Sequence, residues 1–247
     1  MRNKERTGRQ GGEEKKVCFQ CKNCTHSTTA PSVISETTYN QMVKHIPQCQ
    51  ADIQQCNNDG SNNVCDDAEN YCNTYEIEPV TATGVNPYDL RIPCGTSNLC
   101  YNFTNIDVWL NNATVQKQLG VNVKWNSCNN APHIALNADW VKEYQQKIPP
   151  MLASGIRGLI YAGDQDFICN WLGNKAWTLQ MTWDHETDFD NAPDKPWNPD
   201  GTERGIIRTA YNFTFLQVFQ AGHMVPMDQP VSALDMVKAY LSDTLGY

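Results

Sequence analysis

The alternation of apolar and polar positions singles out residues 155–171, which read GIRGLIYAGDQDFICNW. This stretch opens with an apolar run, 156–162, that only two residues interrupt, and such a run predicts a buried parallel strand. Asp164 and Asp166 follow the run, and helical spacing resumes over 171–178. Carboxylates at the point where a strand gives way to a helix are poorly placed for a core. They are well placed for a site at the carboxyl end of a sheet, where open α/β folds carry their chemistry.

A second strand with polar chemistry behind it lies further along the chain. Residues 213–219 (FTFLQVF) are β-branched and aromatic, which predicts a strand, and they run into a loop that contains His223. A strand, a loop with Asp, another strand and a loop with His form the second half of a hydrolase triad in the chain order Ser, Asp, His. We therefore expect His223 to be a general base and Asp166 its orienting acid. Asp164 is a rival acid that chemistry alone does not exclude.

The N-terminal third predicts a helix, a turn and an extended segment. Ser35 is suited to cap a helix whose apolar positions recur at i, i+3, i+4 and i+7. Residues 57–63 (NNDGSNN) are a turn cluster, and residues 71–86 are expected to be extended and rich in turns. Four cysteines flank the turn, and spacing alone leaves three connectivities open for them. They are Cys49, Cys56, Cys65 and Cys72.

Three further segments are assigned by their spacing. Residues 106–119 predict one amphipathic helix, and residues 139–148 predict another that two prolines end. The polar, Pro-rich residues 184–201 indicate a surface excursion between the two strands. Asp228 is a suitable N-cap for the last helix. The buried stripe of that helix is expected at Leu234, Val237 and Leu241.

Composition narrows the class of protein. The 247 residues could form one large domain, and a hydrophobic content of 40% is enough for a globular core. A net charge of −8 argues against a nucleic-acid partner, which needs a basic face. No apolar run approaches the length of a membrane span.

Cysteines and glycosylation motifs indicate an oxidising, secretory history. The chain has 11 cysteines, yet residues 1–16 are charged, lack the apolar segment of a secretory signal and are expected to be disordered. A missing N-terminal half would resolve this contradiction. The N-x-[ST] motifs begin at Asn23, Asn102, Asn112 and Asn212.

A cysteine cluster near the N-terminus has the spacing C-x-x-C-x-x-C. Cys18, Cys21 and Cys24, with His26 nearby, could share a zinc ion. A closed tetrahedral site usually needs a second, distant pair of ligands, and no such pair is evident in the sequence. We therefore expect no metal, and the cluster is interpreted as disulfide partners or a misannotated exon edge.

Several segments together resemble the serine carboxypeptidases. They are YAGDQDFICNWLGNKAW, VFQAGHMVPMDQP, NPYDLRIPC, LCYNFTNIDVWLN and NAPHIALNADW, and the resemblance covers roughly residues 30–247. It implies an α/β-hydrolase fold. No G-x-S-x-G occurs in this sequence, so the chain is similar to the C-terminal part of a family member, truncated before its nucleophile. The implied division is 1–30 disordered or misannotated, 31–80 a helical disulfide-stapled insertion, and 81–247 the hydrolase domain.

The resemblance also implies roles for individual residues. It selects Asp166 over Asp164, which would bond loop backbone. It implies the pairs Cys49–Cys72, Cys56–Cys65 and Cys94–Cys100, and a partner for Cys128 outside this chain. Cys169 would line the substrate pocket without acting as a nucleophile. The penultimate side chain of a peptide would lie against Trp140, Ile168 and Met224, and the terminal one against Tyr88, Tyr101 and Met224.

By this resemblance, the function is release of C-terminal residues from peptides through an acyl-enzyme, without metal or cofactor. Family members act in vacuoles, in lysosomes or outside the cell. Without the serine, we expect this chain alone to be inactive. The alternatives are an acyltransferase that uses the same triad, a non-catalytic fragment or pseudoenzyme, and a metal-binding module built on Cys18–His26. The sequence does not predict an oligomeric state.

Overall fold

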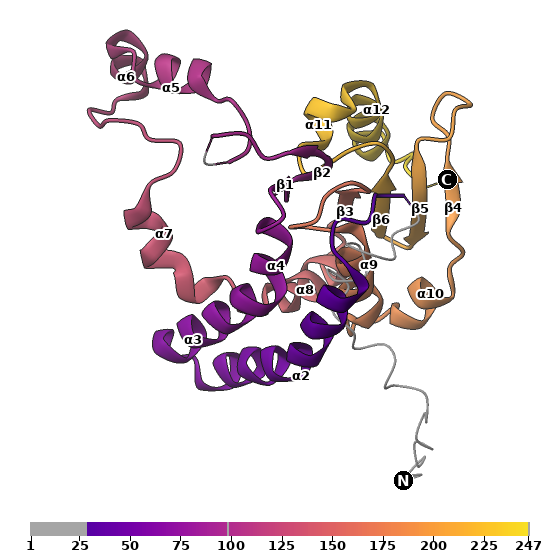
Figure 1. Ribbon diagram of the computed structural model, residues 1–247. Helices are drawn as coiled ribbons and strands as arrows, with labels where there is room; N and C mark the ends of the chain where they lie inside the picture. The colour runs from indigo at the N-terminus through magenta and orange to yellow at the C-terminus, as the bar shows by residue number, and fades with distance from the viewer. Residues whose placement is uncertain (1–28, 98, 247) are drawn as a thin grey trace.

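The computed structural model describes residues 29–97 and 99–246, and a four-stranded sheet lies toward one side of it, at the right in Figure 1. The strand order is β3-β6-β5-β4, with β3 and β6 parallel and the other pairs antiparallel. The two strands predicted from apolar runs are thereby confirmed and are neighbours. The strands are β3 (Gly158–Gly163), β4 (Lys195–Trp197), β5 (Gly205–Ala210) and β6 (Phe213–Val218).

Helices cover both faces of this sheet. The side chains of β6 are mostly apolar on both faces, and burying them requires a helix layer on each side. Phe213 and Phe215 pack against α8, α9 and α10, whereas Leu216 and Val218 pack against α12. Successive side chains of a strand point to opposite faces, so a central strand covered on both sides is buried throughout. The covering helices are α8 (Ile148–Ala153), α9 (Trp171–Gln180), α10 (Glu186–Asn191), α11 (Val225–Asp228) and α12 (Pro230–Leu241).

A helical hairpin precedes the sheet and consists of α2 (Glu36–Asp59) and α3 (Asn62–Cys72). The predicted cap is confirmed, since the Ser35 hydroxyl accepts a hydrogen bond from the Thr38 amide at 3.1 Å. Gly60 ends α2 with φ of 74°, a conformation that favours glycine. Disulfides join Cys49 to Cys72 and Cys56 to Cys65 across the hairpin.

The extended conformation expected for residues 71–86 is wrong over most of that segment. The helix continues through the π-helical η2 (Asn73–Ile77) into α4 (Glu78–Thr81), where Val80 is fully buried. The proline in the first turn of α4 does not interrupt it, because amides in a first turn need no helical partner. Extended backbone begins only with β1 (Val85–Asn86), which pairs with β2 (Asp89–Pro93).

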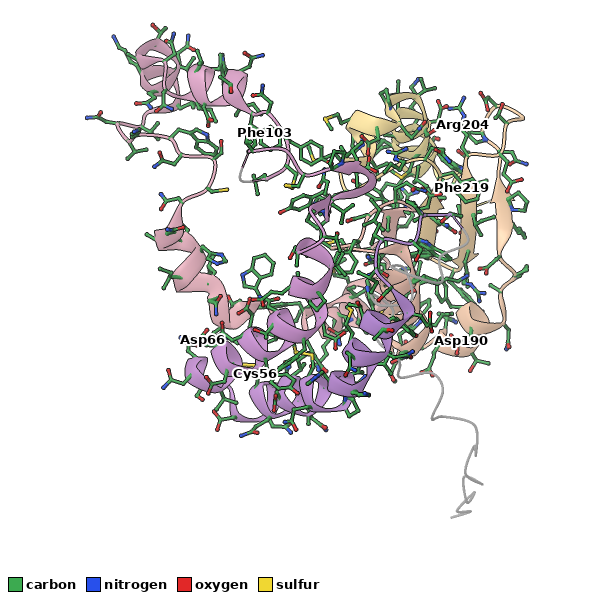
Figure 2. The ribbon with its side chains drawn as sticks, in the orientation of Figure 1. Cys56, Asp66, Phe103, Asp190, Arg204 and Phe219 are labelled. Carbon is green, nitrogen blue, oxygen red and sulfur yellow. A yellow bond between two sulfur atoms is a disulfide. The ribbon has the colours of Figure 1, made fainter. Side chains whose placement is uncertain are left out.

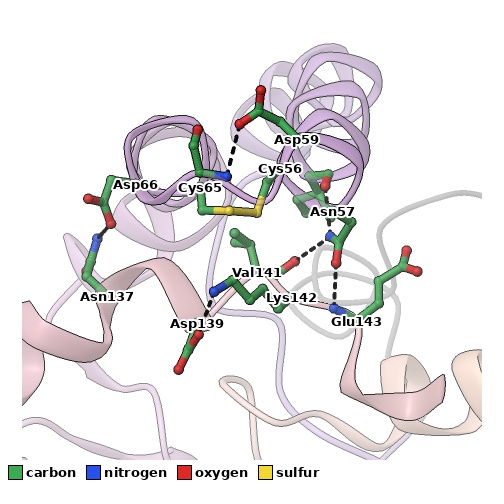
Figure 3. The surroundings of a disulfide bond; sticks show 12 residues. Cys56, Asn57, Asp59, Cys65, Asp66, Asn137, Asp139, Val141, Lys142 and Glu143 are labelled. Carbon is green, nitrogen blue, oxygen red and sulfur yellow. Dashed lines mark hydrogen bonds and ion pairs between the residues drawn. A yellow bond between two sulfur atoms is a disulfide. The ribbon is translucent and has the colours of Figure 1, made fainter. Parts of the chain in front are cut away.

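The hairpin also packs against a much later segment (Figure 3). The Asn57 side chain donates to the Val141 carbonyl at 2.9 Å and accepts from the Glu143 amide at 2.8 Å. In the same interface, the Asn137 side-chain amide donates to the Asp66 carboxylate at 2.9 Å. Segments on both sides of the predicted boundary at residue 80 therefore pack into one another.

The segment between hairpin and sheet departs from its predicted helices. Residues 106–119 form two helices rather than one. The first ends at its C-cap Asn111, and the next residue, Asn112, caps α6 by accepting from the Thr114 amide at 2.9 Å. The prolines after residue 148 begin α8 instead of ending a helix. Figures 1 and 2 show α5 and α6 standing apart from the sheet, with Phe103 at the root of this arm. The elements are α5 (Thr104–Leu110), α6 (Ala113–Leu119), α7 (Asn130–Leu136), η3 (Asn137–Asp139) and η4 (Tyr144–Lys147).

Three expectations for the C-terminal part are wrong. Residues 184–201 contain α10 and β4, and they bury Phe189 and Trp197, whose aromatic rings supply core surface. Asp228 does not cap α12, because its carboxylate accepts from the Gly222 amide at 2.7 Å. The predicted stripe of Leu234, Val237 and Leu241 is exposed, and the buried positions of α12 are Ser232, Ala233 and Met236.

The predictions for residues 1–28 lie outside the described residues. They include the disorder of residues 1–16, the cluster from Cys18 to His26 and the Asn23 motif. Among residues 29–97 and 99–246, no helix combines the length and the apolar character that crossing a bilayer requires.

Candidate active site

Asp166 and His223 are joined where β3 and β6 end. The parallel pair is in register from Gly158–Phe213 to Gly163–Val218, so the two loops that follow leave the sheet side by side. Asp166 Oδ2 lies 3.0 Å from His223 Nδ1. The carboxylate is buried and its other oxygen accepts from the Cys169 amide at 3.3 Å. The His223 side chain is 39% exposed, so Nδ1 contacts Asp166 while another part of the ring is open to solvent.

The turn between β1 and β2 fixes both loops from outside the sheet. The Pro87 carbonyl accepts from the amides of Phe167 and Ile168 at 3.1 and 3.0 Å. The neighbouring Tyr88 carbonyl accepts from the His223 amide at 2.8 Å. Two adjacent carbonyls therefore hold the acid and the base in one arrangement.

Gly163 lets the histidine loop come this close. A Cβ at this position would lie 2.2 Å from the Ala221 carbonyl oxygen and 2.3 Å from that of Gly222. Real Cβ contacts essentially never fall below 3.0 Å, so only glycine fits here without moving backbone.

Asp164 faces the backbone of the same loop and not the imidazole. It is 1% exposed and accepts from the Gln165 side chain at 3.0 Å. Burial raises the pKa of Asp164, and hydrogen bonds from the amides of Ala221 and Gln220 oppose that rise. Its contacts are those of a residue that holds the loop, and only Asp166 reaches His223.

Arg91, which the sequence did not indicate as a site residue, supports the loop that contains His223. Arg91 makes two hydrogen bonds to the Asp89 carboxylate, at 2.8 and 2.6 Å, and donates to the Gln220 carbonyl at 3.0 Å. It also lies 3.8 Å from Asp228. No sequence signal links these residues, because β2 and the histidine loop are far apart along the chain.

The contact between Asp166 and His223 shifts the pKa of both groups. The pKa of His223 is raised to about 10, first by the hydrogen bond to Asp166 and second by that to Cys169. The pKa of Asp166 is raised by burial, and its hydrogen bond to His223 opposes the rise. The carboxylate thus stabilises the imidazolium, which is the form that a triad histidine reaches when it takes a proton.

Four of the residues expected to border a substrate pocket lie around this pair. The Tyr88 ring is 5.4 Å from the His223 ring and 6.1 Å from the Tyr101 ring. Ile168 belongs to the Asp166 turn, and Met224 follows His223 directly. Burial raises the pKa of both tyrosines.

Trp140 is not brought to this cluster by any contact among the described residues. Trp140 directly follows η3 along the chain, is 67% exposed, and has its ring 6.1 Å from that of His133. The sequence could not show this, because the path of residues 104–147 depends on packing against the hairpin.

The remaining predicted residues divide into bridged and free groups. Cys94 and Cys100 form a disulfide, so the three bridges are those that the resemblance implies. Cys128 and Cys169 are free and exposed. Asp166, Cys169 and His223 each offer one donor atom within 4.8 Å of the others, which is a set that could hold a soft divalent metal.

The asparagines of the three described glycosylation motifs differ in their bonding. Asn102 and Asn112 each accept a hydrogen bond from the amide two residues on, through the side-chain oxygen. Asn212 instead uses its amide nitrogen, which donates to the carbonyls of Leu152 and Ile156, both at 2.9 Å.

Known proteins match most of the length of this chain. The family model described as serine carboxypeptidase matches residues 16–243. Carboxypeptidase Y of Candida albicans is 41% identical over 221 residues, which cover 88% of this chain and 41% of that protein. Carboxypeptidase Y homolog A of Fusarium vanettenii is 44% identical over 216 residues, covering 85% and 40%. Serine carboxypeptidase-like 49 of Arabidopsis thaliana is 39% identical over 215 residues, covering 86% and 41%.

A solved structure shows the same fold. It is that of Kex1(delta)p, a prohormone-processing carboxypeptidase from Saccharomyces cerevisiae, with a TM-score of 0.66 and 21% identity. The match covers 92% of this chain and 53% of that one. The chain thus spans about two fifths of the length of the curated relatives that it matches.

Proposed function

The chain belongs to the serine carboxypeptidase family, and we propose that it supplies the acid and the base of a Ser-Asp-His peptidase site. The observation that carries the proposal is the 3.0 Å contact between Asp166 and His223 Nδ1. It leaves the other ring nitrogen available for a serine hydroxyl. His223 would take the serine proton and return it to the leaving amine, while Asp166 holds the tautomer and stabilises the imidazolium.

The reaction is the release of C-terminal residues from peptides through an acyl-enzyme. Tyr88, Tyr101 and Met224 would border the pocket for the terminal side chain, with Ile168 and Cys169 on the side of the penultimate one. These mostly apolar groups favour hydrophobic side chains.

The nucleophile would come from a polypeptide segment other than these 247 residues, since they contain no G-x-S-x-G. β3 is an edge strand of the described sheet, so a further strand that carries the serine has room beside it. In this α/β-hydrolase, residues 31–80 would be the disulfide-stapled insertion and residues 81–247 the C-terminal part of the hydrolase domain. We infer a vacuolar, lysosomal or extracellular location from the family and the bridged cysteines.

The experiment combines the intact mass of the native, deglycosylated protein with labelling by a serine-directed phosphonate. A mass well above 27.9 kDa with one labelled serine supports the proposal. A mass near 27.9 kDa without labelling contradicts it and favours a non-catalytic fragment. The purified 247-residue chain is expected to release no C-terminal residue from a blocked dipeptide, because binding and an oxyanion hole alone give only about 10³–10⁴-fold over water. Product formed on an added alcohol acceptor would instead indicate an acyltransferase.

A further inference from the structure

A cleft with a volume of about 810 Å³ lies at the end of the sheet where β3 and β6 begin. Its lining comes from α8 and the turn that follows, from the segment between α9 and α10, and from the two residues before β6. Because β3 and β6 are parallel, Asp166 and His223, which follow the two strands, lie at the opposite end of the sheet. Small-molecule sites occupy about 300–1,000 Å³, so this cleft has the size of a ligand site.

Three aromatic rings are gathered in this cleft. The His185 and Tyr211 rings are stacked with their centroids 3.4 Å apart, and the Trp183 ring stands at 76° to that of His185 at 5.6 Å. Trp183 also contacts the core residue Phe213, at 5.7 Å between ring centroids, which fixes its position. Tyr211 is 57% exposed, so much of its ring surface is open to a ligand. The faces of aromatic rings are negative and attract cations.

Carboxylates add negative charge at the edge of this cleft. Residues 184–190 (DHETDFD) contain four acidic side chains, and Asp184 is one of the residues that line the cleft. Of the four, only Asp188 forms an ion pair within the described part of the chain, with His185 at 3.3 Å. The described lining contains no lysine and no arginine. The cleft therefore combines negative ring faces with carboxylates that no basic residue of this lining neutralises.

We propose that this cleft binds a small organic cation, an ammonium group with apolar substituents, whose charge lies against the Trp183 and Tyr211 rings and near the Asp184 carboxylate. Aromatic rings recognise quaternary ammonium groups in this way. Leu152 and Ala153 supply apolar surface for the substituents of the ammonium group. The proposal does not rest on the proposed peptidase function, because the cleft shares no residue with that site.

Charge distinguishes this ligand from the other classes that the cleft could hold. A sugar or a neutral alcohol could contact the same rings, but its binding would not depend on the charge of Asp184. An anion would be repelled by the carboxylates of residues 184–190. Binding of a cation should therefore weaken when salt is added and when the carboxylate at the cleft is removed.

The test is a titration of the 247-residue chain with choline, followed through the assigned indole N–H resonance of Trp183 in proton–nitrogen NMR spectra. The matched ligand is 3,3-dimethyl-1-butanol, which has the shape of choline with carbon in place of the charged nitrogen. We expect a saturable shift with choline, and binding about tenfold tighter than that of the neutral alcohol.

Variants separate the contribution of the carboxylate from that of the ring. Asp184→Asn should weaken choline binding about threefold and leave binding of the alcohol unchanged. Tyr211 has a φ of 51°, a conformation that asparagine tolerates, so Tyr211→Asn removes the ring without a change of backbone. We expect Tyr211→Asn to weaken choline binding about fivefold. The control is Asp67→Asn in α3, which removes an exposed carboxylate far from the cleft along the chain and should leave choline binding unchanged.

The proposal is overturned if choline produces no saturable shift, or if the neutral alcohol binds as tightly as choline. Choline binding that both Asp184→Asn and Tyr211→Asn leave unchanged would overturn it as well. A methyl glucoside that binds where choline does not would identify a sugar site and refute the cation. Neither the titration nor the variants involve Asp166 or His223, so this proposal and the peptidase proposal can fail independently.

Discussion

Replacing Gly163 with alanine should separate the acid from the base without touching either. The added Cβ would lie 2.2 and 2.3 Å from the carbonyl oxygens of Ala221 and Gly222. Real Cβ atoms essentially never approach another heavy atom closer than 3.0 Å. The Ala221 carbonyl oxygen, at 2.2 Å, must therefore move away by about 0.8 Å, and the histidine loop moves with it. The loop has little room, because a Cβ on Gly222 would itself lie 2.3 Å from the Tyr88 carbonyl.

This movement of the loop should lengthen the hydrogen bond between Asp166 and His223. Its length is 3.0 Å, and a retreat of that size takes it past the range in which an N–H···O hydrogen bond is effective. Overpacking of this kind costs about 1–3 kcal/mol of folding free energy. Because that hydrogen bond is the largest cause of the raised pKa of His223, we expect this pKa to fall from about 10 toward 6.5 in Gly163→Ala.

The assay is an NMR titration of the imidazole nitrogens of His223, with circular dichroism to establish that each variant is folded. The matched control is Gly173→Ala in α9, where the three atoms nearest to an added Cβ all belong to the Asn170 side chain, the closest at 3.4 Å. This control should leave the titration unchanged. A folded Gly163→Ala in which His223 titrates as in the parent would refute the reasoning, because the glycine would then not set the distance between acid and base.

Three other predictions concern pH, disulfides and glycosylation. The folded-state pKa of His223 is raised, so its contribution to stability should be complete below about pH 6.5 and lost as the pH rises through about 10. Urea unfolding should give a lower free energy of unfolding at pH 9 than at pH 6 in the parent, and a smaller difference in Asp166→Asn. Replacing Cys49 and Cys72, which are 23 residues apart, with serine should cost about 3 kcal/mol of unfolding free energy, against about 2 for the six-residue loop of Cys94 and Cys100; an equal loss from both pairs in urea unfolding would contradict the loop-length basis. In a secretory host, Asn212 should carry no glycan because both of its amide hydrogens are bonded to backbone carbonyls, whereas Asn102 and Asn112 should accept one; a glycan on the Asn212 peptide of folded protein would show that this clamp is dispensable.

Local sequence was informative wherever neighbours along the chain decide the structure. The apolar runs of β3 and β6, the Ser35 cap and the turn at Gly60 follow from propensity, period and capping, which act over a few residues. It failed where a distant element competes. Asp228 looked like a helix cap, but its carboxylate bonds the Gly222 amide and lies near Arg91. In α12 the face with larger side chains was expected inside, yet the sheet buries the face with Ala233 and Met236.

The sequence by itself determined which residues could do chemistry, because an Asp and a His that each follow a strand carry that potential in any fold. It could not determine how near they come. That distance depends on the parallel pairing of β3 with β6, on the glycine at the end of β3 and on two carbonyls of the β1–β2 turn. These contacts join parts of the chain about 55 to 135 residues apart, and such pairings leave no periodic signal in a single sequence. The chemistry of the residues left Asp164 and Asp166 open, and the family resemblance favoured Asp166; the tertiary structure shows that Asp166 reaches His223 and that Cys169 lies beside them both.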